Sequence, residues 1–371
     1  MKKLGFGMMR LPEITEGETK RVDLEAVCRM VDLFLERGFT YFDTAYFYHD
    51  RKSEIVVREA LVKRHPRESF VLADKLPVSF LKSENLKKED VFEEQCSKCG
   101  VMYFDYYLLH NLNTEHYEIA ERHDCFAFVS RLKAEGRVGK IGFSFHDTAE
   151  VLDRILTAHP EVDFVQLQLN YLDWESESVQ SRLCYETCQK YGKPVIVMEP
   201  VRGGRLANLP ARAEKLLKGA RPEMSVASWA IRFAASRENV FMVLSGMSNM
   251  EQLTDNLSYM NDPEPMTQEE IKMLEETVRI IREDVAVSCT GCRYCVEGCP
   301  KQIAIPEYFA LYNAAMQERD GDHAEQRAAY AELTGDFGKA SDCIRCRACE
   351  KSCPQRIRIV EALKNVAQVF E

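Results

Sequence analysis

The sequence lacks any apolar run long enough to cross a membrane. No stretch of its 371 residues approaches the roughly 20 apolar residues that a spanning helix requires. Near the N-terminus only residues 4–9 form an apolar run, which Arg10 ends and which is shorter than the apolar core of a secretory signal. We therefore expect a cytoplasmic protein, in which metal binding or catalysis explains the abundance of cysteine (fourteen residues) better than disulfides do.

The sequence also lacks an excess of positive charge and any low-complexity segment. Its formal net charge of −10 disfavours nucleic acid or an anionic membrane surface as the main partner. With 46% apolar and 29% charged residues, the composition is that of a folded chain. A single (β/α)8 barrel with a small appended domain would use this length completely.

Eight apolar, strand-like segments recur along the first 250 residues, and helical apolar spacing follows them, as at Val27, Val31 and Phe34. Strands that alternate with helices require a parallel sheet, and eight such units predict a closed TIM barrel in the α/β class. An open doubly wound sheet stays the alternative, although no Gly-x-Gly-x-x-Gly follows the first strand. The predicted strands are residues 4–11, 40–45, 70–76, 104–110, 140–145, 164–170, 194–200 and 240–247.

Eight cysteines repeat one pattern near the C-terminus. Both runs read Cys-x2-Cys-x2-Cys-x3-Cys-Pro, the first over residues 289–300 and the second over 343–354. Each run resembles that of two-cluster bacterial ferredoxins, in which the fourth cysteine ligates the other cluster. The resemblance implies two [4Fe-4S] clusters. One ligand set is Cys289, Cys292, Cys295 and Cys353, and the other is Cys343, Cys346, Cys349 and Cys299.

A pair of structural zinc sites is the alternative, because Cys-x2-Cys is also a zinc spacing. Zinc motifs, however, need neither the third close cysteine nor the following proline. Between the runs, the alanine-rich residues 306–333 predict one or two helices, broken near Asp320 and Gly321. We therefore predict a barrel over residues 1–283 and a small helical ferredoxin-like domain over 284–371.

Four further cysteines form two pairs with no third ligand nearby in the sequence. Cys96 and Cys99 lie on one predicted helix, and Cys184 and Cys188 lie on another. A metal site needs more ligands than each pair supplies, so we expect these residues to be buried as small apolar side chains.

Polar side chains stand at the carboxyl ends of predicted strands, where barrel enzymes place their chemistry. Asp43, Lys75 and His110 end three consecutive strands, and Tyr48 follows the first of these. A lysine beside a phenol lowers the pKa of the phenol, so that Tyr48 can deliver a proton near neutral pH. Each residue alone has a structural interpretation, as a cap, a snorkelling lysine or a core histidine. Their convergence favours function.

The sequence resembles the aldo-keto reductase family over residues 1 to about 280. The matching segments are LGFGMMRLP (4–12), GFTYFDTAYFYHDRKSE (38–54), ADK (73–75), YYLLH (106–110), GKIGFSF (139–145) and NMEQLTDNL (249–257). The resemblance implies that Asp43, Tyr48, Lys75 and His110 are the catalytic tetrad. Tyr48 is then the general acid for a substrate carbonyl, Lys75 and Asp43 tune it, and His110 orients the carbonyl oxygen.

The same resemblance implies contacts to a nicotinamide cofactor. Ser144 and Gln166 stand where the family binds the carboxamide, and Asn256 matches a residue near the adenine. Met198 stands in place of the stacking aromatic. Other departures are Phe145 for an asparagine, and Gly246 and Gln252 for the basic residues that hold the 2′-phosphate of NADPH. Without a basic partner the preference for that phosphate should be weak, so NADH, NADPH and a flavin all stay open.

The two predicted halves handle electrons differently. A nicotinamide transfers two electrons as hydride, whereas a [4Fe-4S] cluster passes one at a time, so a bridge is needed. We expect an oxidoreductase that acts on a small-molecule carbonyl or alcohol and is coupled through its clusters to a ferredoxin or flavoprotein. Two alternatives stay open: a flavin-dependent reductase of another bond, and a ferredoxin-like carrier with a non-catalytic barrel. Structural or sensing clusters stay open as well.

Overall fold

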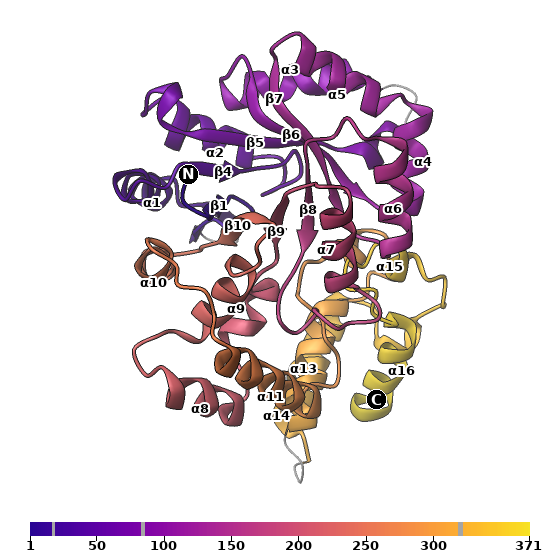
Figure 1. Cartoon of the computed structure of the whole chain (residues 1–371). Helices are drawn as coiled ribbons and strands as arrows, with labels where there is room; N and C mark the ends of the chain where they lie inside the picture. The colour runs from indigo at the N-terminus through magenta and orange to yellow at the C-terminus, as the bar shows by residue number, and fades with distance from the viewer. Residues whose placement is uncertain (17–18, 83–85, 318–321) are drawn as a thin grey trace. The chain divides into compact units, whose positions relative to one another are not determined.

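The computed structural model describes residues 1–16, 19–82, 86–317 and 322–371, which form two compact units (Figure 1). Unit 1 comprises Met1–Ser176, Gln180–Pro200 and Ser228–Met266. Unit 2 comprises Glu177–Val179, Val201–Ala227 and Thr267–Glu371. The domain boundary after residue 283 stays a prediction.

Within the described residues, unit 1 contains a closed parallel barrel in the strand order β1-β10-β9-β8-β7-β6-β5-β4. The barrel closes because β1 pairs with both β4 and β10. Each strand overlaps a predicted one, so the TIM-barrel prediction is confirmed and the open-sheet alternative is wrong. The strands are β1 Leu4–Gly7, β4 Tyr41–Asp43, β5 Val71–Leu76, β6 Phe104–Leu112, β7 Val138–Phe145, β8 Phe164–Gln168, β9 Val195–Met198 and β10 Val240–Gly246.

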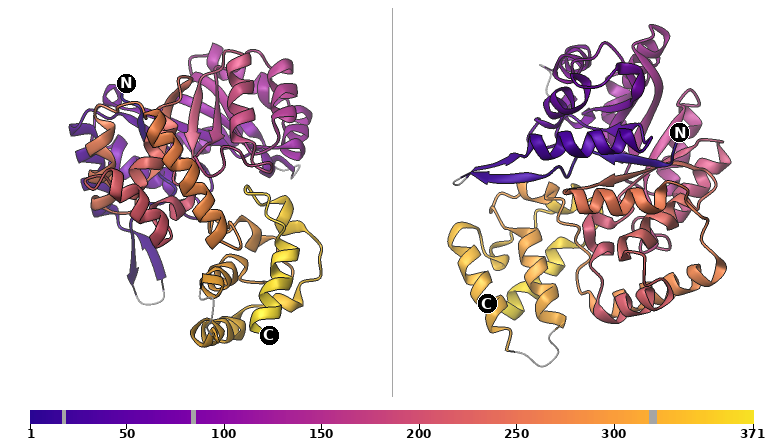
Figure 2. Two further views of the ribbon diagram at one scale, coloured as in Figure 1. Left: turned by 60° about the horizontal axis from the view of Figure 1, so that its bottom comes forward. Right: turned by 90° about the vertical axis from the view of Figure 1, so that its left-hand side faces the viewer.

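Outside the barrel lies an antiparallel strand pair that the apolar pattern did not predict. β2 (Glu13–Glu16) pairs with β3 (Thr19–Val22), and this pair extends away from the barrel in Figure 2. The strand prediction followed apolar runs, whereas EITE and TKRV are mostly polar. A strand pair of this composition is not marked by burial and therefore escapes such a search.

The helices of unit 1 form where the apolar spacing predicted them. In α1 (Leu24–Glu36), Val27, Met30, Val31 and Phe34 are buried, and the Asp23 side chain accepts a hydrogen bond from the Ala26 amide at 3.0 Å. The other α-helices are α2 Ser53–Val57, α3 Lys88–Cys99, α4 Thr114–Arg122, α5 Cys125–Ala134, α6 Ala149–Ala158, α7 Ser181–Lys190, α9 Val226–Ala235 and α10 Met250–Met260. Shorter turns are η1 Arg58–Val62, η2 Arg67–Ser69 and η3 Val78–Lys82.

The two cysteine pairs outside the repeat lie on helices of this unit. Cys96 and Cys99 lie on α3, and Cys184 and Cys188 lie on α7. All four are buried free cysteines, as predicted.

The barrel interior is filled by a layer of apolar side chains from several strands. Tyr41, Ala73, Leu108, Phe164 and Ile196 belong to one buried cluster, each with no more than 1% of its surface exposed. Side chains two positions apart in a strand point to the same side. The residues two positions further along these strands therefore also point into the barrel, closer to its carboxyl end. Those residues are Asp43, Lys75, His110, Gln166 and Met198.

Gly142 brings two of these strands close together. It lies opposite Phe164 in the pairing of β7 with β8, and a Cβ placed on it would approach the Phe164 carbonyl oxygen to 2.5 Å. Glycine is therefore required for this register, which aligns Ser144 with Gln166 two residues later.

Unit 2 is helical in its C-terminal part. Tyr308, Phe309, Leu363 and Val366 lie in its buried core, where α13 packs against both α14 and α16. Its elements are η4 Arg202–Ala207, α8 Ala211–Ala220, α11 Gln268–Asp284, α12 Tyr294–Glu297, α13 Ile305–Gln317, α14 Ala324–Asp336, η5 Ala340–Asp342, α15 Ala348–Lys351 and α16 Ile359–Phe370. α13 and α14 confirm helices between the cysteine runs, while the break predicted at Asp320 and Gly321 falls outside the described residues.

Among the described residues, no helix is both long enough and apolar enough to cross a membrane.

Candidate active site and iron-sulfur site

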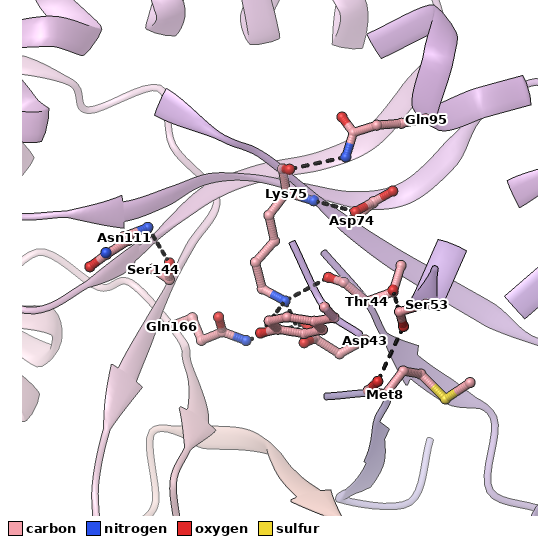
Figure 3. Close-up of polar contacts among 11 residues, drawn as sticks. Met8, Asp43, Thr44, Ser53, Asp74, Lys75, Gln95, Asn111, Ser144 and Gln166 are labelled. Atoms are coloured by element: carbon pink, nitrogen blue, oxygen red, sulfur yellow. Dashed lines mark hydrogen bonds and ion pairs between the residues drawn. The ribbon is translucent and has the colours of Figure 1, made fainter. Parts of the chain in front are cut away.

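Lys75 is the centre of the polar group at the barrel mouth. Its side chain is 1% exposed, and its Nζ lies 2.5 Å from Oδ1 of Asp43 and 2.7 Å from the Thr44 carbonyl oxygen (Figure 3). The same Nζ donates to the Tyr48 hydroxyl at 3.3 Å. A buried ammonium needs a charged partner, which Asp43 supplies. Three of the four predicted tetrad residues thus share one hydrogen-bond network.

The pKa values of Asp43 and Tyr48 are both raised. Burial raises the pKa of Asp43, although Lys75 and Gln166 act to lower it. Burial also raises the pKa of Tyr48 well above its ordinary value, and the charges of Asp43 and Asp74 raise it further. The lowered Tyr48 pKa expected from the sequence is therefore wrong for this chain, because burial and nearby carboxylates outweigh the cations around the phenol. The Tyr48 hydroxyl therefore keeps its proton at neutral pH.

His110 completes the group from β6. Its ring lies edge-on to that of Tyr48, with 6.1 Å between the ring centroids. Burial lowers the pKa of His110 well below its ordinary value, and the charges of Lys75, His146 and His116 lower it further. The imidazole is therefore neutral at physiological pH, so one ring nitrogen carries a proton that it can donate to an oxygen.

Ser144 and Gln166 lie on neighbouring strands at the same mouth. They face each other in the pairing of β7 with β8, and each is 1% exposed. Gln166 donates to Oδ2 of Asp43 at 3.3 Å, and Ser144 Oγ accepts a hydrogen bond from the Asn111 amide at 2.7 Å (Figure 3). A hydroxyl and a carboxamide beside the Asp43–Lys75 pair can hydrogen-bond a planar amide.

Two other predicted cofactor contacts lie on β9 and α10. Met198 ends β9, opposite Gln168. Asn256 is buried on α10, where it donates to Ser245 Oγ at 2.7 Å and accepts from the Tyr259 hydroxyl at 2.5 Å. Asn256 is therefore joined to its own scaffold and is not part of the network around Lys75.

Arg10 is a basic residue at the mouth that the search for phosphate ligands missed. A Cβ built on Gly246, at the end of β10, would lie 3.3 Å from Arg10 Cβ. The charge of Arg10 also acts to lower the pKa of Tyr48. Arg10 comes from the loop after β1, so its nearness to Gly246 depends on barrel closure. The signal in the sequence was Arg10 within MMRLP (8–12), the segment that directly follows β1.

A buried carboxyl pair lies behind Lys75 and was also missed. Asp74 Oδ1 accepts a hydrogen bond from the Lys75 amide at 2.8 Å, and Gln95 Nε2 donates to the Lys75 carbonyl at 3.0 Å and to Glu54 at 3.1 Å. Neither Asp74 nor Glu54 has exposed surface. Burial raises the pKa of both carboxyls, and the charge of Glu54 raises that of Asp74 further. This network fixes the backbone that carries Lys75.

In unit 2, the two cysteine runs lie together. α12 of the first run contacts α15 of the second. A hollow with about 310 Å³ of empty space, partly open to solvent, is lined by all three leading cysteines of the second run and by the fourth cysteine of the first. These residues are Cys343, Cys346, Cys349 and Cys299, the set predicted for one cluster.

The other predicted set is also close together. Burial, together with the charges of Cys292, Cys289 and Cys353, raises the pKa of Cys295 to about 12. Cys353 belongs to the second run, so each fourth cysteine lies with the other run's leading three. Among the described residues, no group of three or more cysteine, histidine or acidic side chains lies close enough to hold a single metal ion. Cluster binding would have to displace the thiol protons.

Two arginines of η4 donate hydrogen bonds to the backbone at the start of the first cysteine run. Neither was predicted from the sequence. Arg202, 4% exposed, donates to the Ser288 carbonyl and to Gln355 Oε1, both at 3.0 Å. Arg205 donates to the carbonyls of Val287 at 3.0 Å and Cys289 at 3.1 Å. The preceding residues of the chain form β9. The signal was the Arg-Gly-Gly-Arg sequence, whose two glycines both have positive φ, 65° and 95°.

Comparison with known families decides the identity of the barrel. The model of the aldo/keto reductase family matches residues 3–279. The chain belongs to this family. It is an oxidoreductase of the aldo/keto reductase type, and the model of a 4Fe-4S dicluster domain matches residues 288–358. The second match favours clusters over the zinc alternative.

Individual relatives of this aldo/keto reductase are distant. A "Probable aldo-keto reductase 1" from Glycine max is 28% identical over 50% of this chain, which spans about half (53%) of that relative's length. The solved structure of the thermostable aldo-keto reductase Tm1743 with the inhibitor epalrestat gives a TM-score of 0.59 at 20% identity, covering 74% of this chain and 94% of that one. An aldo-keto reductase from Klebsiella pneumoniae in complex with NADPH gives 0.56 at 20% identity, covering 74% and 90%. At these identities, the solved structures support the fold.

Proposed function

We propose that the barrel mouth interconverts a carbonyl and an alcohol on a small molecule, with Tyr48 as the proton donor. The supporting observation is that Lys75 joins Asp43 and Tyr48 through one buried ammonium. The raised pKa of Tyr48 keeps its proton available. Neutral His110 donates a hydrogen bond to the same substrate oxygen and so orients the carbonyl.

A reduced nicotinamide would supply the hydride that reaches the carbonyl carbon, while Tyr48 supplies the proton that reaches the oxygen. Ser144 and Gln166 would hold the carboxamide of that nicotinamide, and Met198 would pack near its ring. Asn256 would lie near the adenine after releasing its contacts to Ser245 and Tyr259. The Klebsiella relative was solved with NADPH, which makes NADPH the first cofactor to test.

Arg10 supports a phosphorylated dinucleotide at this mouth. It packs beside Gly246, at the site where the family resemblance left no basic residue. A guanidinium forms strong charge-assisted hydrogen bonds with phosphate oxygens. We therefore assign Arg10 to a phosphate group of the cofactor.

In the dicluster domain we propose two [4Fe-4S] clusters with crossed ligand sets. Cys289, Cys292, Cys295 and Cys353 would hold one, and Cys343, Cys346, Cys349 and Cys299 would hold the other. The hollow beside the second set and the closeness of Cys353 to the first run support these sets. An anaerobic preparation should contain about eight iron and eight sulfide per chain.

We further propose that the clusters exchange electrons with an external one-electron carrier, such as a ferredoxin or a flavoprotein. A flavin, on the partner or at the barrel mouth, would divide the electron pair of the hydride. The fourteen free cysteines support a reducing compartment, the cytoplasm. A spectrum of the anaerobically purified chain would reveal a bound flavin.

Tyr48→Phe tests the assignment of the acid. With NADPH and a panel of aldehydes and ketones, we expect turnover to fall about 10²- to 10⁴-fold, the usual contribution of a general acid. Tyr46→Phe is the matched control, because the Tyr46 hydroxyl donates to Glu94 at 3.1 Å and not to the Lys75 network. Undiminished carbonyl turnover in Tyr48→Phe would show that Tyr48 is not the proton donor.

A further inference from the structure

The second cysteine run presents one of its ligand cysteines to solvent. Cys346 is exposed, whereas the other seven cysteines of the two runs are buried or half-buried. Its neighbours Ile344, Arg345 and Arg347 are exposed as well, with 57% of the Ile344 surface accessible. Electron transfer slows steeply with distance, so an exposed ligand marks the side from which a partner can reach the cluster.

The sequence segment that contains Cys346 has a net charge opposite in sign to that of the whole chain. Residues 339–358 contain six lysines and arginines but only two acidic residues, while the chain carries a net charge of −10. The first run differs, since residues 287–301 hold Arg293 and Lys301 against Glu297. Arg293 is in addition paired with Glu307. The basic excess is therefore a property of the second run.

Basic and apolar side chains meet directly at the hollow that the second ligand set lines. Ile344, Arg347 and Lys301 line this hollow beside the four cysteines. The Arg347 side chain is 72% exposed, and its partner Glu350 lies 3.7 Å away. An exposed apolar residue rimmed by positive charge is suited to a weak, rapidly exchanging protein contact.

We propose that Ile344–Arg347, together with Lys301, is the docking surface for a small acidic one-electron carrier protein. The inference rests on the proposed function, because it requires a cluster on Cys343, Cys346, Cys349 and Cys299. One electron passes in each encounter: the reduced carrier loses it and the oxidised cluster gains it, and the reverse transfer uses the same surface. Nucleic acid would also be attracted by the charge, but a redox ligand at the centre of the surface favours a redox protein.

The experiment uses the holoprotein and a reduced acidic ferredoxin or flavodoxin as the probe. Stopped-flow absorbance under anaerobic conditions follows cluster reduction while the ionic strength is varied. Opposite charges steer association by a factor on the order of 10 to 10³ at low salt. We expect the second-order rate constant to fall at least about tenfold from 10 to 300 mM salt, flattening as screening becomes complete.

Paired charge-reversal variants locate the surface. Arg345→Glu with Arg347→Glu should slow reduction by the acidic carrier at least about tenfold at low salt. The control, Lys215→Glu with Arg327→Glu, makes the same change in net charge at exposed positions on α8 and α14 and should change the rate less than about twofold. Reduction by the methyl viologen radical cation should not slow in either variant, because this probe is itself positive.

Further readouts separate the possible failures. Iron and sulfide contents equal to those of the wild type establish that the variants still hold clusters, and cluster-free wild-type protein would refute the proposed function itself. The docking surface would be overturned if clusters are present and NADPH-dependent carbonyl turnover is intact, but the rate constant for reduction by the carrier depends neither on salt nor on charge reversal at Arg345 and Arg347. Binding of a short DNA duplex that depends on the same two arginines would overturn it too.

Discussion

Asp74→Asn is expected to stabilise the barrel at neutral pH, although it alters a fully buried residue beside Lys75. Burial and the nearby Glu54 raise the pKa of Asp74 in the folded chain. A raised pKa means that the folded chain keeps a proton that the unfolded chain releases above about pH 3.9. The associated stability is complete below that pH and is lost as the pH rises toward the folded pKa. Asparagine retains an oxygen for the Lys75 amide but has no proton to lose.

The change in unfolding free energy follows from the one proton that Asp74 binds in the folded chain and releases in the unfolded chain. Over the interval between the unfolded and folded pKa values, the wild type loses up to about 1.4 kcal/mol of unfolding free energy per pH unit. For a domain of this size, 1 kcal/mol shifts Tm by about 2–4 °C. Calorimetry of both proteins at pH 5, 6 and 7 should show Asp74→Asn melting higher, with a difference that grows by up to a few degrees per pH unit.

Asp163→Asn is the matched control with the opposite sign. Burial acts to raise the pKa of Asp163, but the hydrogen bonds from Lys133 and the Ile141 amide and the charges of Lys133 and Lys140 give a lowered value. Its stability contribution is therefore present above the unfolded pKa and is lost as the pH falls. Asp163→Asn should destabilise the chain at pH 7, and less so on acidification. A lower Tm for Asp74→Asn at pH 7, or a difference independent of pH, would refute the reasoning.

Three further predictions concern the cofactors and the acid. Arg10→Met should raise KM for NADPH about tenfold or more, the effect of losing a charged hydrogen bond, as initial-rate kinetics would measure. Arg202→Met should lower the midpoint potential of one cluster by about 70 mV, since a charge on the order of 10 Å away at an effective dielectric near 20 is worth about 1.7 kcal/mol. In the same redox titration, Arg212→Met, which removes an exposed ion pair to Glu283, should leave both potentials unchanged. Because the pKa of Tyr48 is raised, the alkaline limb of kcat/KM for carbonyl reduction should lie above about pH 10, and a limb near pH 8 would contradict this.

The cysteine repeat and the barrel strands could be predicted because each depends on a pattern of residues that lie close together in the sequence. A run such as residues 289–300 fixes its own ligand spacing, and strands such as residues 164–168 are marked by their apolar residues. The β2–β3 pair could not be found in this way, since its residues are mostly polar. The pKa of Tyr48 was misjudged because the sequence does not show how deeply the phenol is buried or which carboxylates folding brings near it.

The sequence by itself thus determined the eight barrel strands and the two cysteine runs, because periodicity and spacing act over a few residues. Only the tertiary structure decided which of these residues meet. Barrel closure brings Arg10 to Gly246, and the packing of α12 on α15 brings the two cysteine runs together. It also placed Asp74 beside Glu54, where removal from water changes what both carboxyls can do.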